Sequence, residues 1–456
     1  MRDASVQPPT ATKARKIFIA AIFACGRKHR AAAFAGELLF LLATGLSVLS
    51  AAVMLAAPQV IAVLAPGLKE AALAADLLRI VFPYIALISL VALFAGMLNA
   101  GGHFRAAAAA PLLLNIALIA AALLFAPAFM PPITALAWGV LAGGALQLLL
   151  VGFCARRAGL RLRIRPRPPD ARMRNALRLI ALSALGAGAV QINLLINLAV
   201  ASLLAAGSIS WLYYADRLME LPAGLLGAAL ATVALPALAQ SDPRRASEIL
   251  DHVLRLALLL SAPAAAGMAI LAEPAVNVLF LRGAFRAEDA VQTARAAAAY
   301  SAGVVGLTAL RPLAAAFFAR KDAAAPAKTA LAALVITQLF NLLFVFTLDW
   351  GHSGIALSIG LAATFNAGAL LWILRRRKWY LPQPGWTRLF AALIAALGAM
   401  SAVLWAALPE AEFWSGDWSA RAAALGGLVL LGAAVYFAAL RLGGIRLADF
   451  RRAETP

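Results

Sequence analysis

The sequence predicts an all-α membrane protein that crosses the bilayer about twelve times. Of its 456 residues, 64% are hydrophobic and only 13% are charged, which is far from the composition of a soluble domain. The mean hydropathy is +0.88. Apolar runs of about twenty residues, the length that spans the hydrocarbon core of a bilayer, recur along the chain. Together these three observations exclude a soluble fold.

The predicted transmembrane helices coincide with these apolar runs. Several runs contain proline, such as Pro111 and Pro312, which a membrane bundle tolerates because neighbouring helices can satisfy the freed backbone groups. The predicted spans are 36–57, 77–98, 108–129, 133–154, 176–203, 218–240, 253–279, 295–318, 324–347, 353–374, 389–408 and 422–440.

Positive charge alternates between successive loops. Loop 155–175 carries eight arginines and loop 375–388 carries five cations, whereas loop 58–76 is nearly neutral and loop 409–420 is acidic. Cation-rich loops remain on the cytoplasmic side of a membrane. The pattern therefore predicts a multi-pass inner-membrane protein with both termini in the cytoplasm. The charge-balanced loop 280–294 is the exception to the alternation and should be external.

A weak internal repeat suggests two related lobes. Tyr84 begins a stretch that reaches Pro111, and Tyr300 begins a similar stretch that reaches Pro326. Such repeats are common in secondary transporters, with the substrate site between them. The predicted organisation is a cytoplasmic segment 1–33, a first lobe of four helices 34–154, a basic cytoplasmic loop 155–175, a second lobe of six helices 176–375, two C-terminal helices 376–440 and a cytoplasmic tail 441–456.

The sequence carries no signature of an enzyme, a metal site or a cofactor. Its two cysteines, Cys25 and Cys154, are isolated, and none of the common nucleotide, hydrolase or zinc motifs is present. The formal net charge of +20 would suggest nucleic acid in a soluble protein. Here the cations lie in short loops between apolar runs, so they set membrane topology and predict no nucleic-acid partner.

The segment 207–222 combines three aromatic residues with Asp216, Arg217 and Glu220 between two long apolar runs. Charges at membrane depth usually face a bundle interior or an aqueous cavity. Arg217 and Glu220, three residues apart, can pair on one helix face, and a guanidinium suits bidentate binding of phosphate oxygens. One interpretation is a substrate-binding site; the other is an aromatic interface belt with a structural ion pair.

Other polar groups within the apolar runs are weaker candidates. Arg311, beside Pro312, requires a partner or a cavity, and Gln191 and Asn193 are candidate substrate contacts. Hydrogen bonding between helices accounts for most such residues. The remaining polar residues of this kind are Asn115, Asn197, Gln338, Asn341 and Asn366.

Several stretches resemble the MviN/MurJ family of lipid II flippases, within the exporter superfamily abbreviated MOP. They include Trp211–Pro222 (WLYYADRLMELP), the stretch from Arg79 to Asn99 and the residues from Ala319 to Lys328. The resemblance implies two six-helix lobes plus two C-terminal helices, and a cationic cavity for the headgroup of undecaprenyl-diphosphate-linked muropeptide. It further implies a groove for the polyprenyl tail beside the last two helices, and alternating access between the leaflets.

The resemblance also implies roles and partners. Arg217, with Asp216 and Glu220, matches the family's essential arginine region in the second lobe. Lipid II, membrane lipids and the cell-wall synthesis machinery are the implied partners, and no cofactor is implied. The family's first two helices, which supply further cavity arginines, have no counterpart in this sequence; the resemblance begins near Phe34.

Two alternative functions remain open at this point. One is a cation-coupled exporter of drugs or of another lipid-linked oligosaccharide on the same fold, which should keep an intramembrane carboxylate as its ion site; Glu37, Asp216 and Glu220 are the few candidates. The other is a truncated remnant that does not transport.

Overall fold

The structure is a computed structural model that describes residues 28–159 and 170–445. Every regular element in these ranges is a helix, which confirms the all-α class. Ten helices there are long and apolar enough to cross a membrane, and the bent pair α11 and α12 makes eleven. The remaining predicted span, 176–203, coincides with α8 (Ala171–Ser202), whose described apolar part is Gln191–Ser202.

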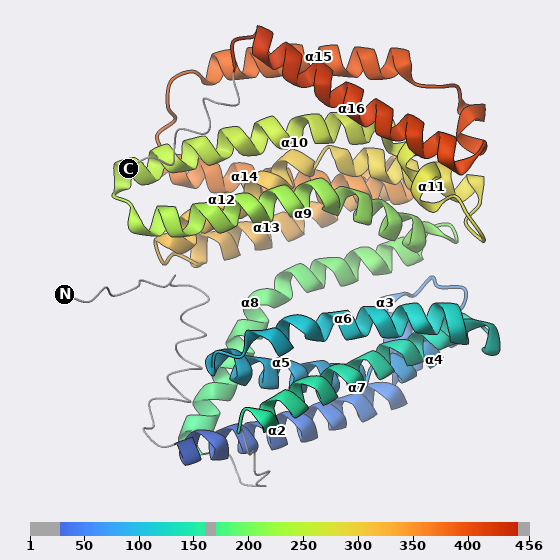
Figure 1. Ribbon diagram of the computed structural model, residues 1–456, viewed down its shortest axis with the longest axis vertical. Coiled ribbons are helices and arrows are strands. Elements are labelled where there is room, and N and C mark those ends of the chain that lie inside the picture. The colour runs from blue at the N-terminus through green and yellow to red at the C-terminus, as the bar shows by residue number, and fades with distance from the viewer. Residues whose placement is uncertain (1–27, 160–169, 446–456) are drawn as a thin grey trace. The chain divides into compact units, whose positions relative to one another are not determined.

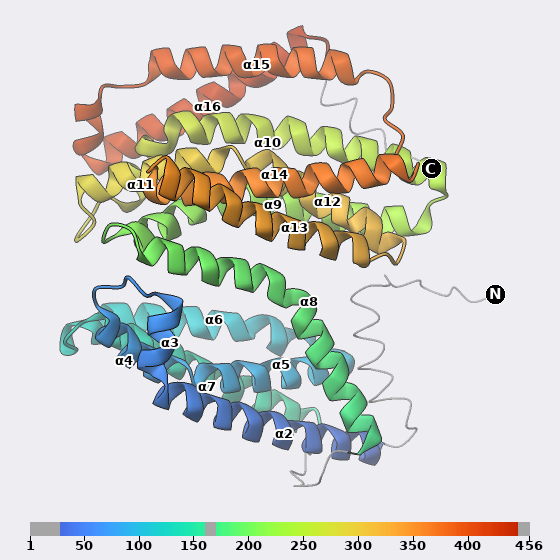
Figure 2. The ribbon, with the colours of Figure 1, turned by 180° about the vertical axis from the view of Figure 1, so that it is seen from behind.

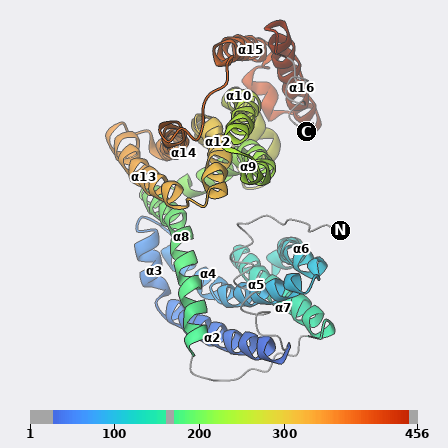
Figure 3. The same ribbon diagram turned by 90° about the vertical axis from the view of Figure 1, so that its left-hand side faces the viewer.

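The chain divides into two compact units, Met1–Leu185 and Gly186–Pro456, and the division falls within α8. In the first unit, α7 packs on α5 and α6, and α2 packs on α5 (Figure 3). Small buried clusters join these helices, one of them around Val91, Leu98 and Val151. The helices of this unit are α2 (Lys28–Leu55), α3 (Ala57–Leu64), α4 (Ala71–Val81), α5 (Tyr84–Ala100), α6 (Phe104–Ala120) and α7 (Ile133–Arg157).

The second unit is built around α9 and α12, which pack closely together. Helix α14 packs on α11, α12 and α13, and α13 and α14 lie side by side in Figure 2. Helices α15 and α16 form a pair that covers α10 (Figure 1). After α8, its helices are α9 (Ser208–Gln240), α10 (Pro243–Phe280), α11 (Ala287–Ser301), α12 (Val304–Ala319), α13 (Ala324–Asn341), α14 (Gly351–Arg376), α15 (Trp386–Ala407) and α16 (Trp418–Leu442).

Aspartates in loops fix where several helices begin. The Asp242 carboxylate accepts hydrogen bonds from the backbone amides of Arg244 and Arg245, and Asp322 does the same for the first turn of α13. These bonds satisfy amides that have no partner within the helix. The amide of Arg245 holds the pKa of Asp242 below its usual range, and the Arg377 side chain, 2.6 Å from Asp322, does so for the pKa of that carboxyl.

Three segments predicted as loops are partly helical, so the prediction was wrong for those residues. All of helix α3 except its first residue lies in the predicted loop 58–76, and α11 begins at Ala287 within the predicted loop 280–294. Helix α10 begins at Pro243, ten residues before the predicted start at 253. The prediction counted apolar runs only, so it missed short helices and amphipathic helix ends, which capping residues and tertiary packing stabilise.

The order of elements agrees with the internal repeat. A break follows α4 just before Tyr84, and a comparable break follows α11 just after Tyr300. In each unit the next helix ends in a short loop, and the helix after it ends in a π-helical turn, 121–125 or 342–347. The similarity seen in the sequence thus extends to helix breaks that composition does not reveal.

Close contact between α12 and α14 depends on glycine. A Cβ atom at Gly303 would overlap the backbone of Gly360, and one at Gly306 would lie 2.5 Å from the Cα of Thr364. We expect Gly303→Ala to lower the free energy of unfolding of the purified protein by about 1–3 kcal/mol, because a methyl group there forces the two helices apart. Thermal unfolding in detergent measures this change.

The matched control for this prediction is Gly368→Ala. Gly368 also lies in α14, but a Cβ there meets no atom within 4 Å, so stability should be unchanged or slightly higher. Equal unfolding temperatures for the Gly303→Ala and Gly368→Ala variants would show that the close contact is not needed.

Candidate functional site

The segment 207–222 forms the first half of α9, and its start is held in place by Trp211. Gly207, the residue before the helix, has a φ of +103°, a conformation that side chains rarely adopt. The Trp211 ring covers Gly207, since a Cβ there would lie 2.5 Å from the ring. The Trp211 indole donates a hydrogen bond of 2.8 Å to Asp289 in the first turn of α11. Trp211 therefore fixes the position of α9 relative to α11.

Arg217 is held by two carboxylates and one aromatic ring. Its Nη1 donates to Glu220 Oε2 at 2.7 Å, and its Nη2 lies 3.3 Å from Asp216 Oδ2. The guanidinium carbon lies 5.1 Å from the centre of the Tyr213 ring. The predicted pairing of Arg217 with Glu220 is confirmed. The Arg217 side chain is nevertheless 51% exposed, so its guanidinium can still meet an incoming anion.

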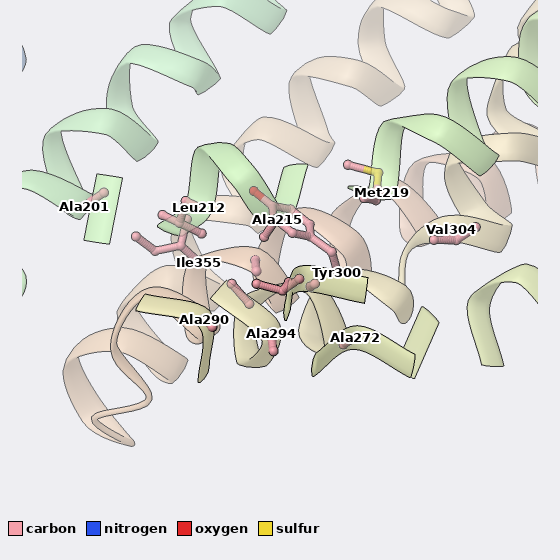
Figure 4. Close-up of a cluster of buried hydrophobic side chains, with 14 of the residues drawn as sticks. Ala201, Leu212, Ala215, Met219, Ala272, Ala290, Ala294, Tyr300, Val304 and Ile355 are labelled. Atoms are coloured by element: carbon pink, nitrogen blue, oxygen red, sulfur yellow. The ribbon is translucent and has the colours of Figure 1, made fainter. Parts of the chain in front are cut away.

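A cavity of about 450 Å³ lies beside Arg217, within the second unit. Helices α8, α9, α11, α12, α13 and α14 contribute to its walls. Leu212, Tyr300 and Ile355 line it and belong to a buried cluster, so one wall is part of the hydrophobic core (Figure 4). The polar lining residues beside Asp216 and Arg217 are Asn193, Asn197, Tyr213, Tyr300, Thr337 and Asn366.

A network of side-chain amides joins α8 to α13 next to this cavity. Gln338 donates to Asn193 at 2.9 Å, and Asn341 donates to Asn197 at 2.8 Å. Such bonds stabilise helix pairs in membranes by about 1 kcal/mol each. Asn193 therefore has a structural partner as well as a place in the cavity lining. Asn366 Oδ1 is buried and accepts no hydrogen bond from any described residue.

The other two candidates lie outside the cavity lining. Gln191 is exposed on α8. Arg311 is also exposed, and its Nη1 donates to the backbone oxygen of Gly224 at 3.0 Å. Gly224 follows Arg217 by seven residues, which is about two turns and about 10 Å along the same face of α9. Arg311 thus reaches the helix face that carries Arg217, without sharing its cavity.

Sequence reasoning missed part of this site. It noted Asn197 and Asn366 as polar residues in apolar runs but did not assign them to the site, and it did not consider Tyr300 or Thr337 as site residues. All four residues line the cavity. The spacing of Asn193 and Asn197, four residues apart, was a usable indication because both face one side of a helix. Tyr300 gave no such indication, since only the fold of α11 against α9 brings it to the site.

Solved structures share this fold. One described as lipid II flippase MurJ in an inward closed conformation superposes with a TM-score of 0.80 at 21% identity, covering 97% of this chain and 91% of that one. An inward-facing multidrug resistance transporter of the MATE family, within the MOP superfamily, superposes with a TM-score of 0.65 at 17% identity, covering 80% of this chain and 87% of that one. The fold defines a multi-pass helical membrane protein with the architecture that these structures share.

Sequence similarity identifies the family to which the chain belongs. The family described as lipid II flippase MurJ matches residues 15–425, so the match extends beyond the resemblance that begins near Phe34. The lipid II flippase MurJ of Burkholderia cenocepacia is 38% identical over 440 residues, which cover 90% of this chain and 82% of that protein. A probable lipid II flippase MurJ of Haemophilus influenzae is 36% identical, over 81% of this chain and 74% of that protein. The chain belongs to the lipid II flippase MurJ family.

Proposed function

We propose that the chain moves lipid II across the bacterial inner membrane, from the cytoplasmic to the periplasmic leaflet, by alternating access. Family membership supports lipid II as the substrate. The observation that carries the proposal is Arg217, a half-exposed cation at membrane depth beside a cavity. A charged headgroup needs such a polar path, because its transfer through bare hydrocarbon is very costly.

In this proposal Arg217 binds the diphosphate of lipid II. The planar guanidinium can donate two parallel hydrogen bonds to phosphate oxygens. In the structure those donors are directed at Glu220 and Asp216, 2.7 and 3.3 Å away. The carboxylates would hold the guanidinium in position when the site is empty. The diphosphate would then compete for its N–H groups, so loading and release of substrate can change these ion pairs.

An apolar groove gives the polyprenyl tail a place to lie. A cavity of about 540 Å³ runs between α9, α10, α15 and α16, and nearly all of its lining residues are apolar. Leu218 and Leu221 belong to this lining, and Leu218 directly follows Arg217 in the chain. Consecutive side chains of a helix point about 100° apart, so the Arg217 site and this groove lie on neighbouring faces of α9. The groove has the chemistry that an isoprenoid chain requires.

The membrane orientation is part of the same proposal. The positive-inside rule applied to loops 155–175 and 375–388 places both, and with them both chain termini, in the cytoplasm. Substrate made inside the cell would then enter from the side of these basic loops, and the acidic loop 409–420 would face the periplasm.

The alternative of a cation-coupled exporter is less favoured. Such a protein needs an intramembrane carboxylate that is free to bind an ion, but two of the three candidates, Asp216 and Glu220, contact Arg217, which leaves Glu37. The family match, which spans most of the chain, also favours flipping over a remnant without transport.

Complementation tests the function directly. We expect expression of the full chain in a strain depleted of its own lipid II flippase to restore growth and to prevent lipid II from accumulating. Continued lysis with accumulated lipid II, despite normal amounts of the chain in the membrane, would contradict the proposal. A change limited to drug sensitivity would instead support the exporter.

A further inference from the structure

A third cavity in the same unit shares no lining residue with the Arg217 site or with the apolar groove. It has a volume of about 680 Å³ and lies between α10, α12, α14 and α15. The parts of α10 and α12 that line it contribute apolar residues and glycine, such as Leu258 and Ala309. Its wide apolar body suits a hydrocarbon chain better than a polar solute.

Polar groups gather at one end of this cavity. Thr364, Gly368, Leu371 and Arg375 line it from α14, and their spacing of four, three and four residues places them on one helix face. Arg375 is the last of this row, one residue before α14 ends. The other polar lining residues at this end, Tyr380, Gln383 and Thr387, come from the connection to α15 and its first turn. The cavity is therefore apolar along α14 and polar at its C-terminal end.

This polar end is cationic, and one of its cations is unpaired within the described structure. Residues 375–378 are four consecutive cations. Arg377 pairs with Asp322 at 2.6 Å, and Arg376 lies over the Trp372 ring at 5.1 Å. Arg375 is exposed, and its side chain forms no ion pair or hydrogen bond with any residue that the structure describes. A cation thus lines the cavity without a counter-ion among the described residues.

The carboxylate that bonds the lining residue Tyr380 is already engaged by several donors. Asp251 is buried and accepts hydrogen bonds from Tyr380, Trp386 and Arg255, at 2.7 to 2.8 Å. These bonds fasten residues 380–386 onto α10, so the walls of the cavity at its polar end are formed before any ligand binds. A preformed site loses less free energy to ordering when it binds its ligand.

We propose that this cavity binds a bilayer phospholipid with an anionic headgroup. Its phosphate would accept hydrogen bonds from Arg375, and an acyl chain would occupy the apolar body between α12, α14 and α15. Basic pockets between transmembrane helices on the cytoplasmic side suit anionic headgroups, which are enriched in that leaflet. The bound lipid would join α14, in the body of the second unit, to α15 of the C-terminal pair.

Native mass spectrometry of the purified full chain tests this proposal. The probes are phosphatidylglycerol and phosphatidylethanolamine with identical acyl chains. We expect the wild-type chain to bind phosphatidylglycerol about tenfold more tightly, because both lipids carry one phosphate anion but Arg375 repels the ammonium group of phosphatidylethanolamine. Arg375→Gln should remove this preference. Gly368→Leu should weaken binding of both lipids, because its side chain enters the body of the cavity.

Two matched variants control for nonspecific effects. Arg376→Gln removes a neighbouring cation that does not line the cavity, and Gly398→Leu adds the same bulk to α15 away from it. A Cβ atom meets nothing within 4 Å at Gly368 or at Gly398, so both leucine variants should fold. Both controls should bind the two lipids as the wild type does.

Several results would overturn the proposal. If the wild type bound the two lipids equally, Arg375 would have no part in selecting the headgroup. If Gly368→Leu bound both lipids as tightly as the wild type does, the lipid would bind outside this cavity. Binding of undecaprenyl phosphate alone would assign the cavity to the transported substrate. A dimer that Gly368→Leu dissociates would assign the cavity to a second copy of the chain. None of these results depends on whether the chain flips lipid II.

Discussion

Replacing Arg217 with alanine is expected to abolish rescue of a flippase-depleted strain while the amount of protein in the membrane stays normal. The change removes the cation beside the cavity and leaves Asp216 and Glu220 without their partner. Two unpaired carboxylates would repel a diphosphate instead of binding it. Because Arg217 is half-exposed, its loss should affect function far more than folding. Growth curves, with lipid II levels measured in parallel, give the readout.

Arg244→Ala is the matched control for this prediction. Arg244 also pairs with a glutamate one turn away, Glu248 at 3.5 Å, but its side chain is 92% exposed and lines none of the three cavities described above. It should support growth as the wild type does. Normal growth of the Arg217→Ala strain would show that the arginine is only a structural ion pair, which is the second interpretation of the sequence.

Replacing Asp251 with alanine is expected to destabilise the protein by about 3–5 kcal/mol, because the change leaves a buried partner charge uncompensated. The Arg255 side chain, 18% exposed, would lose its ion partner at 2.7 Å. Three further donors would lose their acceptor: the Trp386 indole, the Tyr380 hydroxyl and the backbone amide of Gln383. Burial and the bond to Asp251 raise the pKa of Tyr380, so its hydroxyl remains a donor that needs an acceptor. Thermal and SDS-induced unfolding measure the loss.

Glu248→Ala provides the comparison for Asp251→Ala. Glu248 lies on the same helix, less than one turn earlier, and pairs with Arg244 on an exposed surface. Exposed pairs contribute about 0–1 kcal/mol, so this variant should unfold close to the wild-type temperature. If Asp251→Ala were no less stable than Glu248→Ala, the fastening of residues 380–386 to α10 would not depend on this carboxylate.

The sequence was sufficient for the fold class because membrane helices follow from length and hydrophobicity alone. A run such as 389–408 has no other stable structure in hydrocarbon, where every backbone group must be bonded within the segment. The limits of helices α3, α10 and α11 were less predictable. Their missed parts are short or amphipathic, and a cap such as Asp242 or packing against a neighbouring helix decides whether they form.

The candidate site was predictable where its residues are close in sequence. Arg217 and Glu220 are three residues apart on one helix, so their pairing follows from helix geometry. Tyr300 and Asn366 come from distant helices, and their place beside Arg217 depends on how α11 and α14 pack against α9. A single sequence contains no measure of that packing.

The sequence by itself determined a multi-pass helical protein, an alternation of cation-rich and cation-poor loops, and a charged motif that resembles the MurJ family. Each is a local property: hydrophobic length, loop charge, or residues within one helical turn. Only the tertiary structure decided that a cavity lies beside Arg217, that Asp251 fastens residues 380–386 to α10, and that Arg375 lines a separate cavity. These features join residues about a hundred positions apart, and packing between helices, which no local pattern encodes, brings them together.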